Sequence, residues 1–368
     1  MWNIIPPSIK EIHKVFRANG KSLFVVGGAV RDYIIGTKIK DFDLATEATP
    51  TEVLEILKDY RCTTQGASFF VVVVYTEDQP KGMEIATFRE DVYGDKLGET
   101  RNPDVVFSTI DKDVMRRDLT CGALFYDLEK REIIDLVGGI DDIKNKVIKF
   151  VGDPVLRIIE DPLRIQRLIR FATKYGFEID KASIKAVRDN VEKLLIIHKE
   201  RIWTEIRVAF DNGNFITYME YLIDLGIADV IFPGYKINWK VVESSSLEIY
   251  FAYLFLGANT EGMLDKLKDK FKMEHDFSRK VVFLLDLIDI TPEKIQKYFK
   301  DSRDVSSKTI IEWYKLLGIE NNPVHKAFLN YVPTTNAIEL MAQGFQGKRL
   351  GAKITELEIN NFKQLIEN

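Results

Sequence analysis

Apolar and polar positions divide the chain into a β-rich first part and a helical remainder. The first part contains short apolar runs that suit β-strands: "SLFVVGG", "DFDLAT", "FFVVVVY" and "MEIATFR". Between them, "AVRDYIIG" predicts a short helix that ends at Gly36, and "TPTEVLEILKDY" predicts a helix with Thr and Pro at its start. From "PLRIQRLIRFATKYGF" onward the apolar residues are mostly three or four positions apart. The pattern predicts an α+β head of about 150 residues followed by helices.

Composition is ordinary for a globular protein and excludes few functions. The chain has 368 residues, with 52 Lys and Arg against 56 Asp and Glu, so its formal net charge is -4. This balance excludes a uniformly basic nucleic-acid binder, although basic residues can still gather on one face. Two cysteines do not suggest a disulfide framework. Because neither a signal-peptide pattern nor an apolar stretch of about 18 residues is found, we expect a cytoplasmic protein without a membrane span.

A glycine pair at the end of the first apolar run suits the binding of a phosphate. Gly27 and Gly28 lie where the predicted strand meets a helix N-terminus, so the backbone can approach a phosphate and point N–H groups at it. Arg31 follows one turn later and adds positive charge. A plain turn between two elements is the alternative, and the glycine pair alone does not separate the two.

Three carboxylates in the head suggest a metal site. Asp41 and Asp43 are two positions apart on a predicted strand, so we expect both side chains to project from one face. Two carboxylates this close repel each other, and Mg²⁺ relieves the repulsion while phosphate oxygens complete its shell. Glu84 lies after the turn "TEDQPKG" of a predicted hairpin, and it would complete a two-metal site if its run neighbours the Asp strand. A solvent-facing glutamate on an edge strand is the alternative.

The stretch "VMRRDLTCGAL" places two arginines and an aspartate before a β-like run. An adjacent Arg and Asp, such as Arg117 and Asp118, can hold a phosphate and a ribose hydroxyl. A surface ion pair is the commoner outcome for such a cluster. The sequence leaves both interpretations open.

A second cluster surrounds Pro162, which marks the start of a predicted helix. Glu160 and Asp161 stand where the dipole of that helix favours acidic side chains. Asp161 and Arg164 are three positions apart, so we expect them to share one helical face. A simple helix cap is the alternative.

Together these stretches resemble the class II tRNA nucleotidyltransferases, which are the CCA-adding enzymes, and the related bacterial poly(A) polymerases: "GGAVRDYIIGTKIKDFDLAT", "EIATFR", "RRDLT" and "EDPLRIQRLIRFA". "ERIWTEIRVAF" is similar to the family's next helical motif, and "QGKRLGAKITELEINNFKQLIEN" to its C-terminal ending. The resemblance implies a nucleotidyltransferase head with a mixed β-sheet and an all-α remainder. The implied domains are a catalytic head (1–150), a neck for base recognition (151–212), a body (213–300) and a tail for tRNA binding (301–368).

The resemblance also implies roles for the candidate residues. Asp41 and Asp43 would bind Mg²⁺ and, with Glu84 as the third carboxylate, form the catalytic site. The other candidate residues would contact the nucleotide. Gly27, Gly28 and Arg31 would bind its triphosphate, and Arg117 and Asp118 its ribose. Glu160, Asp161 and Arg164, with Arg167 beside them, would recognise its base.

Hydrogen-bonding chemistry supports the implied role at the base. Cytosine and adenine carry an exocyclic amino donor where uracil and guanine carry a carbonyl acceptor. An ionised Asp161 only accepts and Arg164 only donates, so the pair suits the amino group and the adjacent ring nitrogen of C or A. UTP or GTP would set its carbonyl oxygen against the carboxylate of Asp161, so that buried acceptors oppose each other. Such a penalty can favour CTP and ATP over UTP and GTP by about 10⁴-fold.

The implied activity is template-independent addition of C, C and A to the 3′ end of tRNA from CTP and ATP, with release of pyrophosphate and no obligate protein partner. A poly(A) polymerase shares every catalytic motif, but "QGASFFVVVV" lacks the basic pair that the polymerases have after this glycine. A CC- or A-adding enzyme and a non-catalytic RNA-binding protein are further alternatives, and the intact carboxylates argue against the last. The loop "FREDVYGDKLGETRNPDVVF" favours CCA or A addition, although it is longer than usual.

Two features fit the family less well. Gly122 stands where the family usually has Asn. His275 and Asp276 suggest a metal-dependent phosphohydrolase of the kind found in some relatives, which needs several His and Asp residues. The chain has only 4 His, so we expect His275 to be a surface residue at a helix start.

Overall fold

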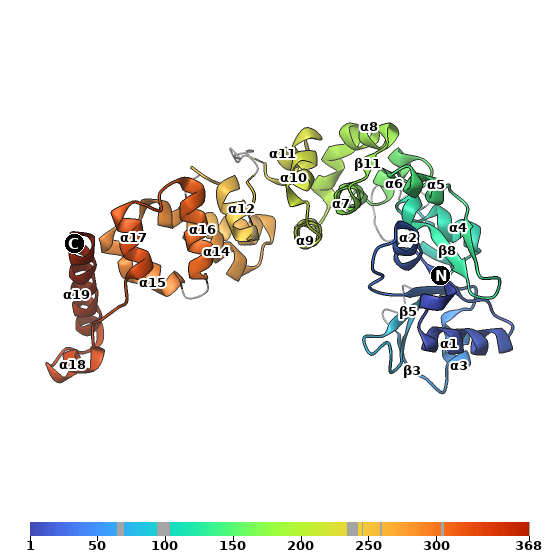
Figure 1. The fold of residues 1–368 in the computed structure, drawn as a ribbon, viewed down its shortest axis with the longest axis horizontal. Helices are drawn as coiled ribbons and strands as arrows, with labels where there is room; N and C mark the ends of the chain where they lie inside the picture. Colours follow the sequence, from blue (N-terminus) through green and yellow to red (C-terminus); the bar gives the residue numbers. More distant parts are fainter. Residues whose placement is uncertain are drawn as a thin grey trace. The chain divides into compact units, whose positions relative to one another are not determined.

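The computed structural model describes residues 1–64, 70–93, 104–233, 242–244, 246–257, 260–302 and 305–367. The chain forms two compact units (Figure 1). The sheet unit consists of Met1–Ile197 and Asp211–Ile231, and the helical unit consists of His198–Phe210 and Phe232–Asn368. The predicted division into four domains is finer than these two units and stays a proposal.

A seven-stranded mixed sheet forms the centre of the sheet unit, in the order β3-β4-β5-β2-β1-β8-β9. Its strands are β1 (Phe24–Val26), β2 (Asp43–Thr46), β3 (Arg61–Thr64), β4 (Val71–Tyr75), β5 (Met83–Thr87), β8 (Leu124–Asp127) and β9 (Glu132–Asp135). β2 and β5 pair in parallel, and the other described neighbours in this sheet are antiparallel. The predicted α+β head with a mixed sheet is therefore confirmed.

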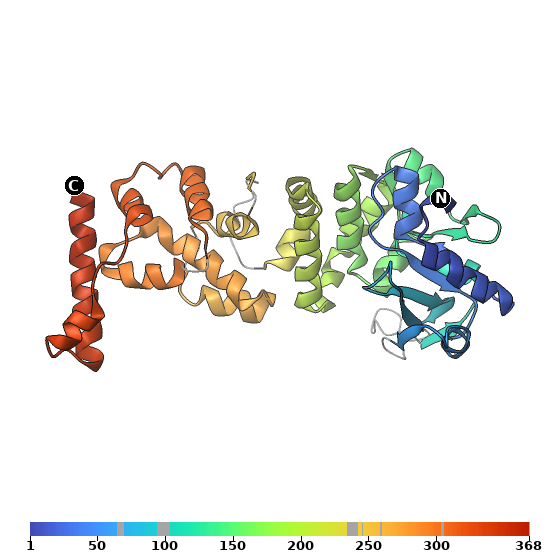
Figure 2. The same cartoon turned by 60° about the horizontal axis from the view of Figure 1, so that its bottom comes forward.

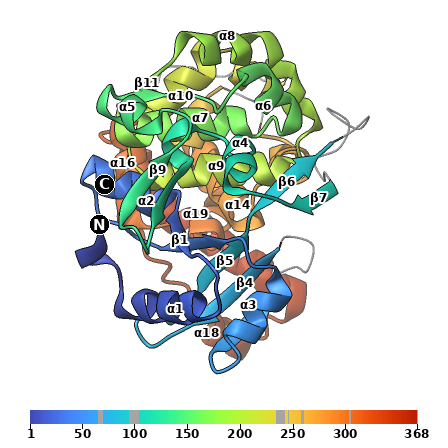
Figure 3. The ribbon, with the colours of Figure 1, turned by 90° about the vertical axis from the view of Figure 1, so that its right-hand side faces the viewer.

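Helices cover this sheet, and Figure 3 shows α1 and α3 on one side of its strands. The helices of the sheet unit are α1 (Pro7–Ala18), α2 (Gly28–Ile35), α3 (Pro50–Ile56), α4 (Ile110–Met115), α5 (Gly139–Lys144), α6 (Pro154–Glu160), α7 (Arg164–Tyr175), α8 (Lys181–Asn190), α10 (Phe215–Asp224) and α11 (Ile227–Ile231), with the short turns η1 (Trp2–Ile4), η3 (Thr120–Gly122) and η4 (Val191–Ile196). Two small sheets complete the unit: β6 (Arg89–Val92) with β7 (Asp104–Phe107), and β10 (Val147–Ile148) with β11 (Glu178–Ile179).

Three buried phenylalanines join the sheet to its neighbours. The rings of Phe24 and Phe88 lie 5.6 Å apart, and Phe88 and Phe125 lie 6.0 Å apart. Val114 from α4 and Val151 from the segment before α6 pack into the same cluster. This core holds the arginine-bearing segment that follows α4 against the strands that carry the carboxylates.

The helical unit contains only helices and turns among its described residues. They are α9 (Lys199–Asp211), α12 (Leu247–Leu254), α13 (Met263–Asp265), η5 (Lys266–Lys270), α14 (His275–Asp286), η6 (Leu287–Asp289), η7 (Pro292–Lys294), α15 (Ile295–Ser302), α16 (Ser307–Leu317), α17 (Pro323–Asn330), α18 (Ala337–Ala342) and α19 (Gly347–Glu367). Figure 2 shows α19 as one long helix beside α18. Trp313 on α16 is fully buried and donates to the Leu284 carbonyl at 2.7 Å. None of the described helices is long and apolar enough to cross a membrane.

Several predicted elements are confirmed. Helix α2 ends at Gly36, which has the left-handed backbone expected of such a cap. Helix α3 begins with a capping box in which Thr49 and Glu52 satisfy each other's backbone N–H groups. The hairpin is present because β4 and β5 pair antiparallel. His275 starts α14 and is exposed, as expected.

The expectation of a purely helical remainder after residue 150 is wrong at β11. Glu178 and Asp180 donate backbone N–H groups to the carbonyls of Lys146 and Ile148, at 2.9 and 3.1 Å. Such a two-residue strand is too short to leave an alternating pattern in the sequence. Two sequence features lie outside the described residues: 65–69, where the basic pair of the polymerases is missing, and 94–103 of the long loop.

Candidate nucleotide-binding site

The glycine turn lies between β1 and α2, as predicted. Gly27 has φ +63 and ψ -116, a conformation that glycine adopts easily and other residues do not. Its N–H donates to the Leu124 carbonyl on β8 at 2.9 Å, so the turn is tied to the sheet. A Cβ built on Gly27 would lie 3.5 Å from Nη1 of Arg117. The turn and this arginine are therefore immediate neighbours.

Arg31 lies against α7. Its guanidinium is buried, with Nε and Nη2 both 2.9 Å from Oδ1 of Asp32. The group lies over the rings of Phe171 (4.9 Å) and Tyr175 (5.1 Å), and the Tyr175 hydroxyl donates to Asp32 at 2.7 Å. Arg31 thus links α2 to α7, and its role at a triphosphate stays a proposal.

The carboxylates gather at one end of two parallel strands. The pairing of Leu44 with Ile85 places the preceding residues, Asp43 and Glu84, side by side. The sequence left this neighbourhood open, and the edge-strand alternative for Glu84 fails because β5 lies between β4 and β2. Asp43 is exposed, yet the surrounding protein partly desolvates its carboxylate. This desolvation raises the pKa of Asp43, and repulsion by Glu84 and Asp41 adds to the effect while Arg117 opposes it.

The strand argument for Asp41 is wrong, because β2 begins only at Asp43. Asp41 lies in the segment before the strand, where no ladder fixes the direction of its side chain. Its charge nevertheless acts on Asp43, so the predicted repulsion between the two carboxylates is present.

A divalent ion fits this group of carboxylates only together with a ligand. In the described part of the chain, no three His, Cys, Asp or Glu side chains are close enough to hold an ion by themselves. Asp41, Asp43 and Glu84 still offer the hard oxygen donors that Mg²⁺ prefers, and Mg²⁺ is commonly held by one or two carboxylates plus the phosphates of a substrate. The donor set therefore suits an ion that is shared with a triphosphate.

Arg116 and Arg117 are held by Asp113, a buried residue that the sequence reasoning missed. Arg116 donates through Nε to Oδ1 of Asp113 at 2.8 Å, and its Nη2 lies 2.7 Å from the same oxygen in an ion pair. Arg117 donates to Oδ2 through Nε at 3.1 Å and Nη2 at 2.9 Å. The spacings of three and four residues were the available signal, because they bring side chains together on a helix.

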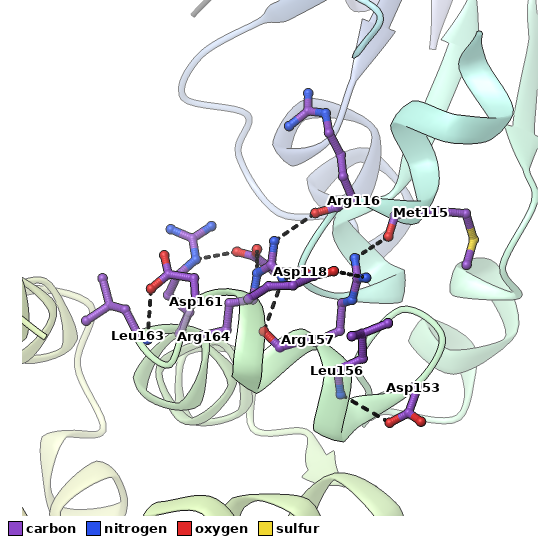
Figure 4. A network of polar contacts seen from close by, with 11 residues as sticks. Met115, Arg116, Asp118, Asp153, Leu156, Arg157, Asp161, Leu163 and Arg164 are labelled. Atoms are coloured by element: carbon purple, nitrogen blue, oxygen red, sulfur yellow. Dashed lines mark hydrogen bonds and ion pairs between the residues drawn. The ribbon is translucent and has the colours of Figure 1, made fainter. Parts of the chain in front are cut away.

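Asp118 performs the same task for two arginines of α7. Arg164 donates through Nε to Oδ1 at 2.7 Å, and Arg167 donates through Nε to Oδ2. Burial alone would raise the pKa of Asp118, but the two guanidinium groups outweigh it and lower the pKa. Figure 4 shows Asp118 and Arg164 pointing toward each other.

Arg164 is buried and connects three segments. Besides Asp118, it donates to the Glu160 carboxylate and to the carbonyls of Arg157 (3.1 Å) and Arg116 (2.9 Å). Among the described contacts, four of its five N–H groups are used, and one on Nη2 remains. Glu160 also accepts from Arg157. Arg164 is thus mainly a tie between α6, α7 and the segment after α4.

The prediction that Asp161 and Arg164 share a helical face is wrong. Helix α6 ends at Glu160 and α7 begins at Arg164, so Asp161 lies between them with an extended backbone (φ -147, ψ 101). The reason is Pro162, which lacks an N–H and disfavours helical backbone in the residue before it. Asp161 Oδ1 accepts from the Leu163 N–H at 3.1 Å, next to the arginine cluster (Figure 4).

Two further positions bear on the site. Burial raises the pKa of Tyr93 to about 12; Arg164 opposes this, and Glu160 adds to it. This tyrosine follows β6, and it lies close enough to Arg164 and Glu160 for their charges to act on its hydroxyl. Gly122 ends η3, and a Cβ built on it would have no heavy atom of the described residues within 4 Å. The backbone therefore leaves room for the asparagine that the family usually has there.

Comparison with known proteins agrees with this fold. Residues 23–149 match the family "Poly A polymerase head domain", and residues 176–237 match "Probable RNA and SrmB- binding site of polymerase A". The sheet unit thus carries a head domain of the poly(A) polymerase class. The chain belongs to the family that comprises poly(A) polymerases and CCA-adding enzymes.

Similar proteins carry both names. Poly(A) polymerase I of Haemophilus influenzae is 31% identical over 270 residues, which is 71% of this chain and 58% of that protein. The CCA-adding enzyme of Enterococcus faecalis is 39% identical over 207 residues, 55% of this chain and 49% of that protein. In these alignments the chain spans about half to three-fifths of its relatives. The structure of the Bacillus stearothermophilus CCA-adding enzyme in complex with CTP has the same fold, with a TM-score of 0.74, 21% identity, and coverage of 99% of this chain and 98% of that one.

Proposed function

We propose that the protein is a CCA-adding tRNA nucleotidyltransferase, which adds C, C and A to the 3′ end of tRNA from CTP and ATP and releases pyrophosphate. The observation that carries the proposal is the meeting of Asp43, Glu84 and Arg117 beside the Gly27 turn. Together these features suit the binding of a triphosphate with its metal ion. The two carboxylates require a cation, the guanidinium of Arg117 can donate to phosphate oxygens, and the glycine turn lets a phosphate approach the backbone. The similarity to CCA-adding enzymes supports the same choice.

In this proposal the carboxylates serve the reacting end of the nucleotide. Mg²⁺ held by Asp41 and Asp43, with Glu84 as third carboxylate, would supply positive charge to the triphosphate and to the RNA 3′-hydroxyl that attacks the α-phosphate; the family resemblance extends this to two ions. The Gly27 turn lets backbone N–H groups approach the phosphates. Arg117, beside this turn, directs N–H groups at phosphate or ribose oxygens.

The α6–α7 junction would select the base. Asp161 accepts from the exocyclic amino group of C or A, whereas the carbonyl of U or G would oppose it. Arg164 has one N–H left for the ring nitrogen, and Arg167 on the same helix supplies a second guanidinium. Residues 151–212 would then be the neck, with 213–300 and 301–368 as body and tRNA-binding tail.

A poly(A) polymerase is the second candidate. The match to poly(A) polymerase I extends over 71% of the chain, against 55% for the CCA-adding relative. One experiment separates the candidates: tRNA transcripts that lack the terminal CCA, and a generic RNA, are incubated with CTP and ATP separately and together, and product lengths are determined. We expect growth by three nucleotides on tRNA only. Long A tails on both RNAs identify a poly(A) polymerase, and addition of only C or only A identifies a partial enzyme.

A non-catalytic RNA-binding protein is the alternative from another class. The Asp41→Ala, Asp43→Ala double variant tests it together with the metal site. We expect this variant to lose nucleotide transfer while keeping its fold by circular dichroism. Equal product formation by the parent and the double variant would contradict the site, and absence of transfer by the parent would favour the binding protein.

A further inference from the structure

Three carboxylates, Asp113, Asp118 and Glu160, hold the arginines described above. Asp113 is the most deeply buried of the three, with 1% of its surface exposed. Both of its oxygens are occupied by guanidinium groups, Oδ1 by Arg116 and Oδ2 by Arg117. It also accepts from the backbone N–H of Arg89 at 3.3 Å. A buried carboxylate stays ionised only when it is paired and hydrogen-bonded in this way. The pairing in turn determines where each guanidinium lies.

Arg117 is held on several sides. The Phe125 ring supports its guanidinium at 4.6 Å, and Nη1 donates to the Gly122 carbonyl at 3.4 Å. The described contacts use three of its five N–H groups, which leaves one on each terminal nitrogen. Nη1 lies beside the Gly27 turn, Nη2 belongs to the same planar guanidinium, and the charge of Arg117 acts on Asp43. The guanidinium therefore presents a fixed pair of donors next to both parts of the proposed phosphate site.

We propose that Asp113 is a positioning residue for the triphosphate: it holds Arg117 so that the two remaining N–H groups meet phosphate oxygens beside Gly27 and Asp43. The inference rests on the proposed function, since it names the group that orients a residue of that site. The fork of an arginine suits two phosphate oxygens only when its plane is fixed, and a buried carboxylate on the adjacent Nε–Nη2 edge fixes it.

Binding of inorganic tripolyphosphate with Mg²⁺ tests the inference, because this probe has neither base nor ribose. Isothermal titration calorimetry with tripolyphosphate and with CTP compares the parent with Asp113→Asn, which keeps the shape but removes the charge. We expect the variant to bind tripolyphosphate and CTP with affinities that are both lower by a factor of about 10, which is the order of one charge-assisted hydrogen bond. The ratio of UTP to CTP incorporation should stay at the parental value.

Matched variants exclude a general loss of structure. Asp113→Glu keeps the charge but moves it by one methylene, so it should stay folded, melt somewhat below the parent because the extra methylene must fit a buried site, and still weaken the binding of tripolyphosphate. Asp118→Asn changes the neighbouring carboxylate, which also holds two arginines; it should alter the UTP to CTP ratio and keep tripolyphosphate affinity within about twofold. In an Arg117→Ala background, Asp113→Asn should cause no further loss of tripolyphosphate affinity.

The outcomes are separable. A folded Asp113→Asn or Asp113→Glu variant that binds tripolyphosphate as the parent does overturns the inference and leaves the proposed function standing. The inference is also overturned if Asp113→Asn weakens binding equally with and without Arg117. A parent that binds neither tripolyphosphate nor CTP overturns the proposed function, and the inference falls with it.

Discussion

Replacement of Arg164 by alanine should destabilise the sheet unit strongly. The side chain is buried, and it donates to two carboxylates, Asp118 and Glu160, and to two backbone carbonyls. Alanine removes all four hydrogen bonds and leaves both acids with fewer cations. Each acid retains one partner, since Asp118 keeps Arg167 and Glu160 keeps Arg157.

The expected free-energy change follows from these contacts. Removing one partner of a buried ion pair costs about 3–5 kcal/mol. Because both acids keep a second arginine, we expect the lower end, about 3 kcal/mol. For a unit of about 200 residues, each kcal/mol lowers the melting temperature by about 2–4 °C, so the expected decrease is about 6–12 °C.

Differential scanning calorimetry of the parent, Arg164→Ala and Arg188→Ala measures this change. Arg188 is exposed on α8 in the same unit, so its replacement should shift the melting temperature by less than about 2 °C. An Arg164→Ala variant that melts within 2 °C of the parent would refute the structural role. If such a variant also incorporated more UTP relative to CTP, Arg164 would be a base-reading residue and not a tie between segments.

Three further predictions concern the metal site, the base and the RNA. Asp43→Asn should abolish nucleotide transfer and raise the melting temperature at neutral pH, because the pKa of Asp43 is raised in the fold and its ionisation therefore opposes folding. The gain in melting temperature should disappear below about pH 4, where the carboxyl group is protonated in both the folded and the unfolded chain. A variant that melts below the parent at neutral pH would contradict this. Asp161→Ala should raise UTP relative to CTP incorporation while rates fall, and a parental ratio would reduce Asp161 to the turn contact seen at Leu163. Affinity for tRNA should fall with salt by a log–log slope of about -0.7 to -0.9 per neutralised phosphate, and a flat plot would exclude RNA as the polymeric substrate.

Local physics made much of the head predictable from its sequence. Gly36 ends α2 because a left-handed residue closes a helix, and Thr49 starts α3 because its side chain accepts a backbone N–H. The neighbouring apolar runs paired as a hairpin across a polar turn. Each of these features depends on residues close together in the chain, so sequence spacing is enough to find them.

The same holds for the candidate residues of the proposed site but not for their geometry. The glycine pair, the carboxylates and the arginine-rich motifs were recognisable by type and spacing. The direction of Arg31 was not, because the partners that bury it, Phe171 and Tyr175, lie far along the chain on α7. Asp161 was misplaced because the backbone preference imposed by Pro162 outweighed the helical spacing.

The sequence by itself determined the α+β head, its helix ends and the residue types available for binding a metal and a nucleotide, since these follow from short-range propensity and side-chain chemistry. Only the tertiary structure decided that Asp118 meets two arginines more than 40 residues further along the chain. Asp113 takes its arginines from the residues just after its own helix, whereas Asp118 takes Arg164 and Arg167 from a later helix. Burial enforces these pairings, because an ionised group removed from water must find an opposite charge wherever the fold provides one.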